Sequence, residues 1–96
     1  MEIKFLTIAE EELLSAIDYY NEQQMGLGFE FADEVQRTLD RIVEFPEAWV
    51  ALSKRSRRCL VNRFPYGLVY QKRTDFILIV AVMHLNKEPH SWRDRK

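Results

Sequence analysis

The segment FILIVAVMH, residues 76–84, limits the possible folds of this chain more than any other stretch. It holds no acidic residue, lysine or arginine and is rich in Val and Ile, a pattern typical of a buried strand. Side chains alternate between the two sides of a strand, and here both sets are apolar. We expect one face to carry Ile77, Ile79, Ala81 and Met83, and the other to carry Phe76, Leu78, Val80 and Val82. Helices should cover one face, and the carboxy-terminal segment, a second copy of the chain or a partner protein should cover the other.

Two amphipathic helices are expected before this strand. The first is predicted over residues 8–25, where apolar side chains recur at helical spacing after a capping box formed by Thr7 and Glu10. The second is predicted over residues 28–45, with apolar side chains again on one stripe. The break around Gly26 is too short for any arrangement other than a helical hairpin.

The rest of the chain has the alternation and turn signals of short strands. We predict strands at residues 1–6, 57–64, 68–73 and 76–84. The last three are joined by tight connections, which allow only antiparallel neighbours. The predicted fold class is therefore α+β: a small antiparallel sheet, made of a short N-terminal strand and a three-stranded meander, with a two-helix hairpin packed on one face.

Length and composition narrow the classes of function. Ninety-six residues are enough for one domain with a modest core. The sequence has no apolar run that could span a bilayer and no signal-peptide pattern at its start, so we expect a cytoplasmic chain. Cys59 is the one cysteine, and with His84 and His90 it gives no spacing typical of a metal site. We expect no metal, no cofactor and no small-molecule substrate.

Charge is divided between the two halves of the sequence. Residues 1–53 hold 3 basic and 12 acidic side chains, a net charge of −9, whereas residues 54–96 hold 11 basic and 3 acidic ones, a net charge of +8. Residues 54–73 alone carry seven basic side chains and no acidic one. Such a segment is typical of a surface for an anionic partner, either a nucleic acid or an acidic protein segment. The alternative is that these charges keep an exposed sheet soluble and discourage edge pairing.

A target-binding surface is therefore predicted on the strands and on the basic tail, residues 89–96. Its candidate residues are Arg55, Arg57, Arg58, Arg63, Lys72, Arg73, Trp92 and Arg93. For Trp92 the alternative role is to hold the tail against the sheet.

The stretches AIDYYNEQQMGLGFEFADEV, RFPYGLVY and VAVMH, followed by Pro89 and Trp92, resemble the RelE/ParE superfamily of toxins from type II toxin–antitoxin modules. The resemblance covers nearly the whole chain and implies a small antiparallel sheet with a helical hairpin. It also implies a cognate antitoxin that wraps the toxin, adding a strand or placing a helix in a groove. The candidate antitoxin contacts are Leu13, Ile17, Tyr20, Phe31, Val35 and Tyr70.

The superfamily implies two different activities. Its RelE-like branch cuts messenger RNA on the ribosome, and its ParE-like branch inhibits DNA gyrase. RNA cleavage needs a proton acceptor and cationic groups at the phosphate, for which Arg58, Arg63, His84 and Lys87 are the candidates. The ribonuclease branch typically has an arginine immediately before the Leu-Val-Tyr motif, where this chain has Gly67. The resemblance therefore favours the ParE-like branch.

Three functions stay open on the sequence. The first is a ParE-like, non-catalytic inhibitor of DNA gyrase that a cognate antitoxin neutralises. The second is a RelE-like, ribosome-dependent messenger RNA endoribonuclease. The third is a non-toxic relative that binds an antitoxin or an operator complex.

Overall fold

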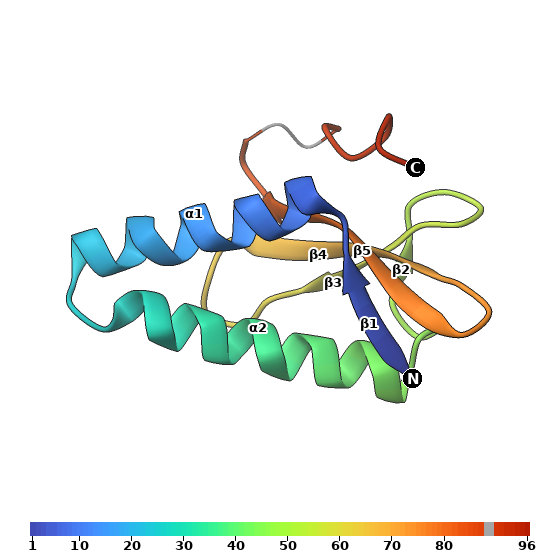
Figure 1. Cartoon of the computed structure of the whole chain (residues 1–96), viewed down its shortest axis with the longest axis horizontal. Coiled ribbons are helices and arrows are strands. Elements are labelled where there is room, and N and C mark those ends of the chain that lie inside the picture. The colour runs from blue at the N-terminus through green and yellow to red at the C-terminus, as the bar shows by residue number, and fades with distance from the viewer. Residues whose placement is uncertain (88–89) are drawn as a thin grey trace.

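The computed structural model describes residues 1–87 and 90–96 of the chain. The elements are β1 (Glu2–Phe5), α1 (Thr7–Gln23), α2 (Leu27–Glu44), β2 (Val50–Ala51), β3 (Arg57–Leu60), β4 (Tyr66–Lys72) and β5 (Phe76–His84). The five strands form one sheet in the order β1-β5-β4-β3-β2, and the α1–α2 hairpin lies across one face of it (Figure 1). The predicted α+β class with a helical hairpin on one face is confirmed.

The sheet is mixed, whereas the sequence predicts an antiparallel one. Strand β1 runs parallel to β5, with Ile3 opposite Ile77, and the other neighbouring strands are antiparallel. The reason is that the whole helical hairpin separates β1 from the rest of the sheet, and a crossover of this length allows parallel neighbours. The two-residue strand β2 at the sheet edge was not predicted.

The strand and helix ends differ from the predictions where the chain turns. Strand β3 ends at Leu60, four residues before the predicted end, and Arg63 in the following loop has a left-handed backbone with a φ of 72°. The predicted capping box of Thr7 and Glu10 is wrong, because Leu6 caps α1 without a side-chain hydrogen bond. The Leu6 N–H donates to Ile79 O, so the chain passes from β1 through this one residue into α1, and leucine has no polar side-chain atom that could cap the helix.

Two glycines allow the tight hairpin between α1 and α2. Gly26 has a φ of 86°, a backbone conformation that glycine adopts without a steric penalty. Gly28 lies against α1, and a Cβ atom there would be 2.1 Å from Ile17 O. The Gly28 N–H also donates to Asn21 Oδ1 at 2.7 Å, which ties the start of α2 to the last turns of α1.

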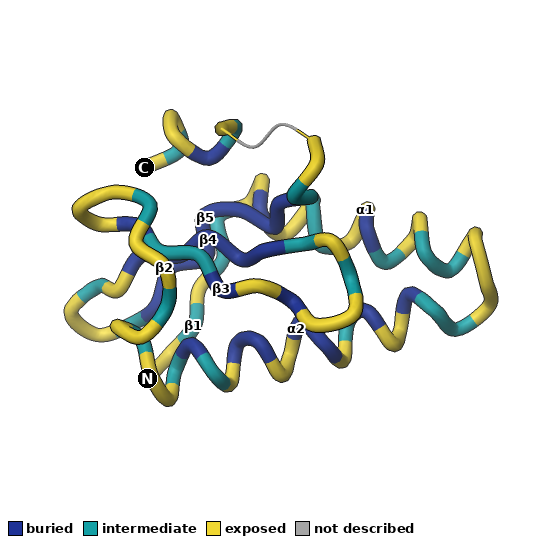
Figure 2. The backbone as a smooth tube through the Cα atoms, turned by 180° about the vertical axis from the view of Figure 1, so that it is seen from behind, coloured by how far each residue is buried: buried dark blue, intermediate teal, exposed yellow. Residues whose placement is uncertain are grey.

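The main core lies between the helical hairpin and the face of the sheet that it covers, here called the helix face. Helix α2 contributes one side chain per turn to it, and the strands contribute the facing ones. Its buried members include Phe31, Val35, Leu39, Ile42, Leu68, Tyr70, Ile77, Ile79 and Val82. Figure 2 shows this alternation of buried and exposed positions along α2.

The other side of the sheet, here called the outer face, carries a second apolar cluster. It contains Val69, Leu78, Val80, Ala81, Met83 and Trp92. A β-bulge explains why Ala81 lies here, since Val69 pairs with Ala81 whereas Tyr70 pairs with Ile79, which leaves Val80 as an extra residue. The bulge reverses the alternation, so the predicted faces of β5 are correct up to Val80 and wrong from Ala81 to Met83.

The carboxy-terminal segment covers part of the outer face. Trp92 is 8% exposed and belongs to the outer-face cluster. Arg95 holds this segment in place, because its guanidinium donates to both carboxylate oxygens of Glu12 at 2.8 and 2.9 Å and to Val80 O at 3.1 Å. Of the predicted tail, residues 89–96, Pro89 lies outside the described residues. Neither helix has the combination of length and apolar character that crossing a membrane requires.

Candidate functional site

A groove lies between α1, the end of β5 and the carboxy-terminal segment, with a volume of about 750 Å³. Its lining combines aromatic and aliphatic side chains with ionisable ones. The lining residues are Ile8, Glu11, Glu12, Ser15, Ala16, Tyr19, Tyr20, Pro65, Tyr66, Val82, Met83, His84, Lys87, Ser91 and Arg95. This composition is typical of a site for an amphipathic ligand.

The aromatic wall of the groove is built from three elements. Tyr20 of α1 lies edge-on to Phe64 and Tyr66, with ring centroids 4.9 and 6.1 Å apart. Tyr66 also lies edge-on to His84 at 5.1 Å. Burial raises the pKa values of Tyr20 and Tyr66, so both phenols keep their protons near neutral pH. They can therefore donate hydrogen bonds to a ligand, and they do not act as bases.

His84 is the one imidazole in the groove. Its Nδ1 accepts a hydrogen bond from the Asn86 N–H at 3.1 Å, which in the neutral ring places the proton on Nε2. The Lys87 N–H donates to His84 O at 3.2 Å, so a tight turn places the two residues together. Both line the groove, as a ribonuclease site would require.

The other two candidates for RNA cleavage lie elsewhere. Arg58 pairs with Val69, whose side chain belongs to the outer-face cluster, so Arg58 lies on the opposite face of the sheet from His84. Arg63 donates to Glu30 Oε1 of α2 at 2.8 Å and lies 3.8 Å from Glu34 Oε2. The four predicted catalytic residues are therefore not gathered in one site.

Gly67 and Arg58 are linked by packing. The Arg58 side chain crosses β4 directly over Gly67, and a Cβ atom at Gly67 would lie 3.0 Å from both Arg58 Cγ and Cδ. The Arg58 Nε is buried without a hydrogen-bond partner among the residues that the structure describes. The close approach of the Arg58 side chain therefore favours glycine at the position before Leu-Val-Tyr.

Most of the predicted antitoxin contacts are core residues. Phe31, Val35 and Tyr70 are at most 2% exposed, so the prediction that a partner contacts their side chains is wrong for the folded domain. Helical spacing identifies a buried face correctly but does not say whether the chain's own sheet or a partner buries it. Leu13 and Ile17 are partly buried against the helix-face core, and Tyr20 lines the groove.

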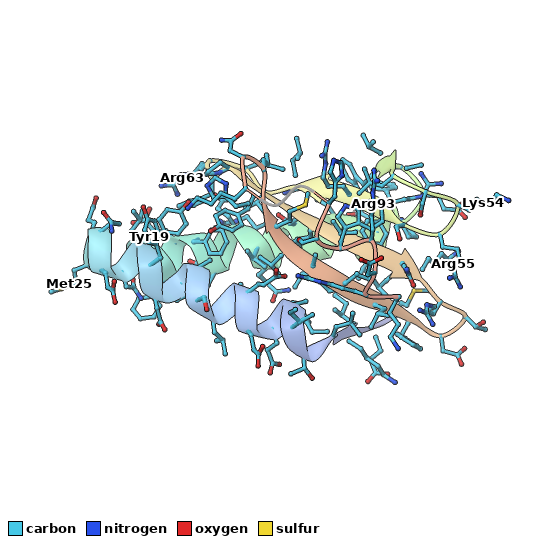
Figure 3. The ribbon with its side chains drawn as sticks, turned by 90° about the horizontal axis from the view of Figure 1, so that it is seen from above. Tyr19, Met25, Lys54, Arg55, Arg63 and Arg93 are labelled. Atoms are coloured by element: carbon cyan, nitrogen blue, oxygen red, sulfur yellow. The ribbon has the colours of Figure 1, made fainter. Side chains whose placement is uncertain are left out.

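The predicted target-binding residues lie in separate parts of the molecule, as Figure 3 shows for Arg55, Arg63 and Arg93. Arg63 lies beside α2 with its carboxylates, and Arg58 lies across β4. Five of the predicted residues lie around the β2–β3 loop and the carboxy-terminal residues, together with two further lysines, and we call this group the basic hairpin patch. The predicted members are Arg55, Arg57, Lys72, Arg73 and Arg93, and the added ones are Lys54 and Lys96. Trp92 is too deeply buried in the outer-face cluster to be a surface contact, and that part of the prediction is wrong.

Gln71 organises the basic hairpin patch, although the sequence pattern does not single it out. Its buried amide donates to Ser56 Oγ at 3.2 Å and to Lys96 O at 3.3 Å. Its Oε1 accepts two hydrogen bonds from the Arg73 guanidinium, at 3.2 and 2.6 Å. One neutral side chain thus connects the β2–β3 hairpin, the end of β4 and the carboxy-terminal segment. A count of charges along the sequence cannot reveal such a residue.

Within residues 1–87 and 90–96, no three His, Cys, Asp or Glu side chains converge where they could hold a metal ion. Cys59 is buried on the helix face, and burial raises the pKa of its thiol. Its environment is that of an apolar core residue.

Comparison with known proteins agrees with the observed fold. A family model described as the ParE toxin of the type II toxin–antitoxin system parDE matches residues 3–89. Among solved structures, the chain is similar to one described as the chromosomal ParDE TA system from P. aeruginosa, with 14% sequence identity and a TM-score of 0.65. The similarity covers 88% of this chain and 96% of the other, and at this identity it shows a shared fold. No curated protein matches the chain.

Proposed function

Because this chain belongs to the family of ParE toxins of type II toxin–antitoxin systems, we propose that it is a growth inhibitor that acts on DNA gyrase and is neutralised by a cognate antitoxin. The family match over residues 3–89 is the observation that carries the proposal.

The dispersed arrangement of the candidate catalytic residues supports inhibition by binding. Cleavage at a ribose 2′-hydroxyl needs a proton acceptor and phosphate-stabilising cations within hydrogen-bond reach of the same few atoms. Here Arg58 and His84 lie on opposite faces of the sheet, and Arg63 is paired with carboxylates of α2. An inhibitor that binds its target needs no such convergence.

We place the antitoxin segment in the groove between α1 and β5. The groove offers apolar and aromatic contacts, and its lining also includes Glu11 and Glu12 of α1 and His84 and Lys87 near the end of β5. An amphipathic segment that folds on binding would match this arrangement, with apolar anchors in the groove and charged groups at its edges. Of the predicted antitoxin contacts, Tyr20 is the one that lines it.

Induction of the chain alone in bacteria tests the activity. A gyrase inhibitor should stop growth and induce the DNA-damage response while messenger RNA stays intact. Cleaved messages with early translational arrest would instead establish the ribonuclease activity. Continued growth with soluble, folded protein would show that the chain is not a toxin. The antitoxin is expected in the neighbouring reading frame, and its coexpression should restore growth.

A groove variant tests the antitoxin site separately from toxicity. Ser15 lies on the exposed surface of α1 and lines the groove, so Ser15→Trp should fill the groove without disturbing the core. We expect this variant to remain toxic and to lose rescue by the antitoxin. Gln36→Trp, at an exposed position of α2, is the matched control and should be rescued normally. Full rescue of Ser15→Trp would place the antitoxin elsewhere on the molecule.

A further inference from the structure

The basic hairpin patch has the features of a surface for a polyanion. It holds seven cationic side chains, and among the described residues only Lys72 of these seven makes an ion pair, with Glu47 at 3.8 Å. Elsewhere in the fold, Arg37, Arg63 and Arg95 each have a carboxylate partner. The cations there that have no ion pair within the described part of the chain, and that do not form a comparable cluster around one loop, are Lys4, Arg41, Arg58 and Lys87. The charge of the patch is therefore left available to an external partner.

The hydrogen bonds that hold the patch together do not reduce its positive charge. Gln71 is 3% exposed and connects Ser56, Lys96 and Arg73 through its amide. A glutamate has the same shape and would also accept the hydrogen bonds of Arg73, but it would neutralise one positive charge. An amide at this position connects the cationic segments by hydrogen bonds without reducing their positive charge.

The shape of the patch fits a partner with two rows of negative charge. The tip of the β2–β3 hairpin carries Lys54 and Arg55, both exposed, and Ser53 Oγ orders the tip by accepting the N–H groups of Arg55 and Ser56. A hollow lies on each side of the tip, and Arg55 lines both. One hollow is also lined by Arg57 and Lys72, and the other by Arg93 and Lys96.

Figure 1 and Figure 2 show the same arrangement at the level of the backbone. The β2–β3 loop projects from the end of the molecule away from the α1–α2 connection, and the carboxy-terminal residues lie beside it. The two hollows lined by cations lie at the base of this protruding loop.

We propose that the basic hairpin patch binds double-stranded DNA, with the β2–β3 loop directed into a groove and the flanking cations on the phosphates of the two strands. Phosphates flank each groove of a duplex, and the major groove of B-DNA is wide enough to admit a two-stranded ribbon. Arginine forks match phosphate oxygens well. This inference goes beyond the proposed function, because it requires neither gyrase nor an antitoxin.

Two alternatives fit the patch less well. Single-stranded nucleic acid is held by aromatic side chains on which bases stack, but the aromatic residue in the lining, Trp92, is buried against the sheet. An acidic protein segment needs apolar anchors for affinity, and the other residues that line the two hollows are mainly charged or small polar ones.

Fluorescence anisotropy with the full chain and a labelled duplex of about 24 base pairs tests the proposal in low salt, about 50 mM. We expect saturable binding. The logarithm of the association constant should fall linearly with the logarithm of the salt concentration, with a slope of about −4 if four or five phosphates are neutralised. The chain has a net charge of −1, so binding by overall charge is not expected.

Matched variants localise the contact. Arg55→Gln combined with Arg93→Gln should lower the affinity at least about 10-fold and reduce the salt slope by about 2, since each lost phosphate contact removes about 0.9. Arg37→Gln combined with Arg63→Gln changes the net charge equally but removes cations that are paired with carboxylates of α2. This control should bind as the wild-type chain does.

Introducing a negative charge at Gln71 gives an independent test. Gln71→Glu should weaken duplex binding several-fold, whereas Gln24→Glu at the exposed end of α1 should not. Circular dichroism and thermal unfolding check that each variant is folded. The proposal is overturned if the wild-type chain does not bind the duplex, or if the patch and control variants lose the same affinity. Equal binding to single-stranded DNA of the same sequence, or to polyglutamate of equal charge, also overturns it.

Discussion

The two faces of the central sheet are covered by very different amounts of structure. On the helix face, α1 and α2, with 17 and 18 residues, enclose a core that includes Phe31, Tyr70 and Ile79. On the outer face, the part of the chain that covers β5 is the short segment around Trp92, held by Arg95 and Glu12. Both faces are apolar in sequence, yet one is sealed by most of the domain and the other by its last few residues.

The helix face therefore stabilises the whole fold, whereas the outer face can change without unfolding the domain. The helix face contains most of the buried side chains, so its disruption affects the global free energy of unfolding. The outer-face segment is a small unit, so the free energy of its local opening is limited to that of the contacts that it makes. The basic hairpin patch includes residues of that segment, so the state of the outer face should influence the proposed DNA contact.

The largest effect is expected on the helix face, from Phe31→Ala. This ring is fully buried and lies against Phe64 and Tyr66, with centroids 5.1 and 4.9 Å away. Its removal should lower the free energy of unfolding by about 3–5 kcal/mol, through lost apolar contact and a residual cavity. Urea denaturation followed by circular dichroism measures the loss. A loss of less than about 1.5 kcal/mol would show that the helix face is not the dominant core.

On the outer face, Trp92→Ala should have a smaller and more local effect. We expect a loss of about 2 kcal/mol, below the usual range for buried aromatic truncations, because the segment can detach while the helix-face core stays intact. Trypsin should then cleave after Arg93 and Arg95 much faster than in the wild-type chain, while cleavage within α1 and α2 stays slow. If Trp92→Ala destabilises the chain as much as Phe31→Ala does, the two faces form one cooperative unit and the contrast fails.

The elements that the sequence predicts well are those set by local patterns. Strand β5 has the predicted bounds, residues 76–84, because a continuous apolar run between a turn and a polar segment needs no tertiary information. The bulge at Val80 is different, since no glycine marks it and it depends on how β4 and β5 fit together. The two-residue strand β2 is stabilised by its pairing with β3, which the sequence does not display.

The site is less predictable than the fold, for a related reason. The concentration of positive charge after residue 53 is visible in the sequence, but the partners of each cation depend on tertiary contacts. Arg63 meets Glu30, which lies 33 residues earlier in the chain, whereas Arg55 meets no carboxylate among the described residues. Arg57 and Arg58 are adjacent in sequence and lie on opposite faces of the sheet. Charge density alone therefore overestimates the size of the basic surface.

A third variant, Glu12→Gln, tests the same comparison, because it weakens the attachment of the outer-face segment and keeps the Trp92 ring. Glu12 Oε1 accepts hydrogen bonds from both Arg95 and the Val82 N–H, so the side chain joins α1, β5 and the segment. The pair is only partly buried, with side-chain exposures of 11% for Arg95 and 27% for Glu12. We expect a loss of about 1–2 kcal/mol in urea denaturation, between the values for surface and buried ion pairs.

Glu11→Gln is the matched control for this variant. Glu11 also lines the groove, but no ion pair within 4 Å is found for it among the described residues. Its substitution should change stability by less than about 0.5 kcal/mol. Equal effects of the two variants would mean that the link to Arg95 does not hold the segment in place.

The smallest effect at neutral pH, and a clear one at alkaline pH, is expected from Tyr70→Phe on the helix face. The Tyr70 hydroxyl donates to Pro46 O, and its loss should cost about 1 kcal/mol. Burial raises the pKa of Tyr70 from 10.0 to about 12, although the nearby Arg57 guanidinium acts in the opposite direction. The unfolded chain therefore loses this proton first, so the contribution is fully present below pH 10 and is lost as the pH rises towards 12. Urea denaturation at several pH values above 9 should show a steeper loss of stability for the wild-type chain than for Tyr70→Phe. Trp92→Ala, on the other face, should keep the wild-type slope, and equal slopes for wild type and Tyr70→Phe would show that another group controls alkaline unfolding.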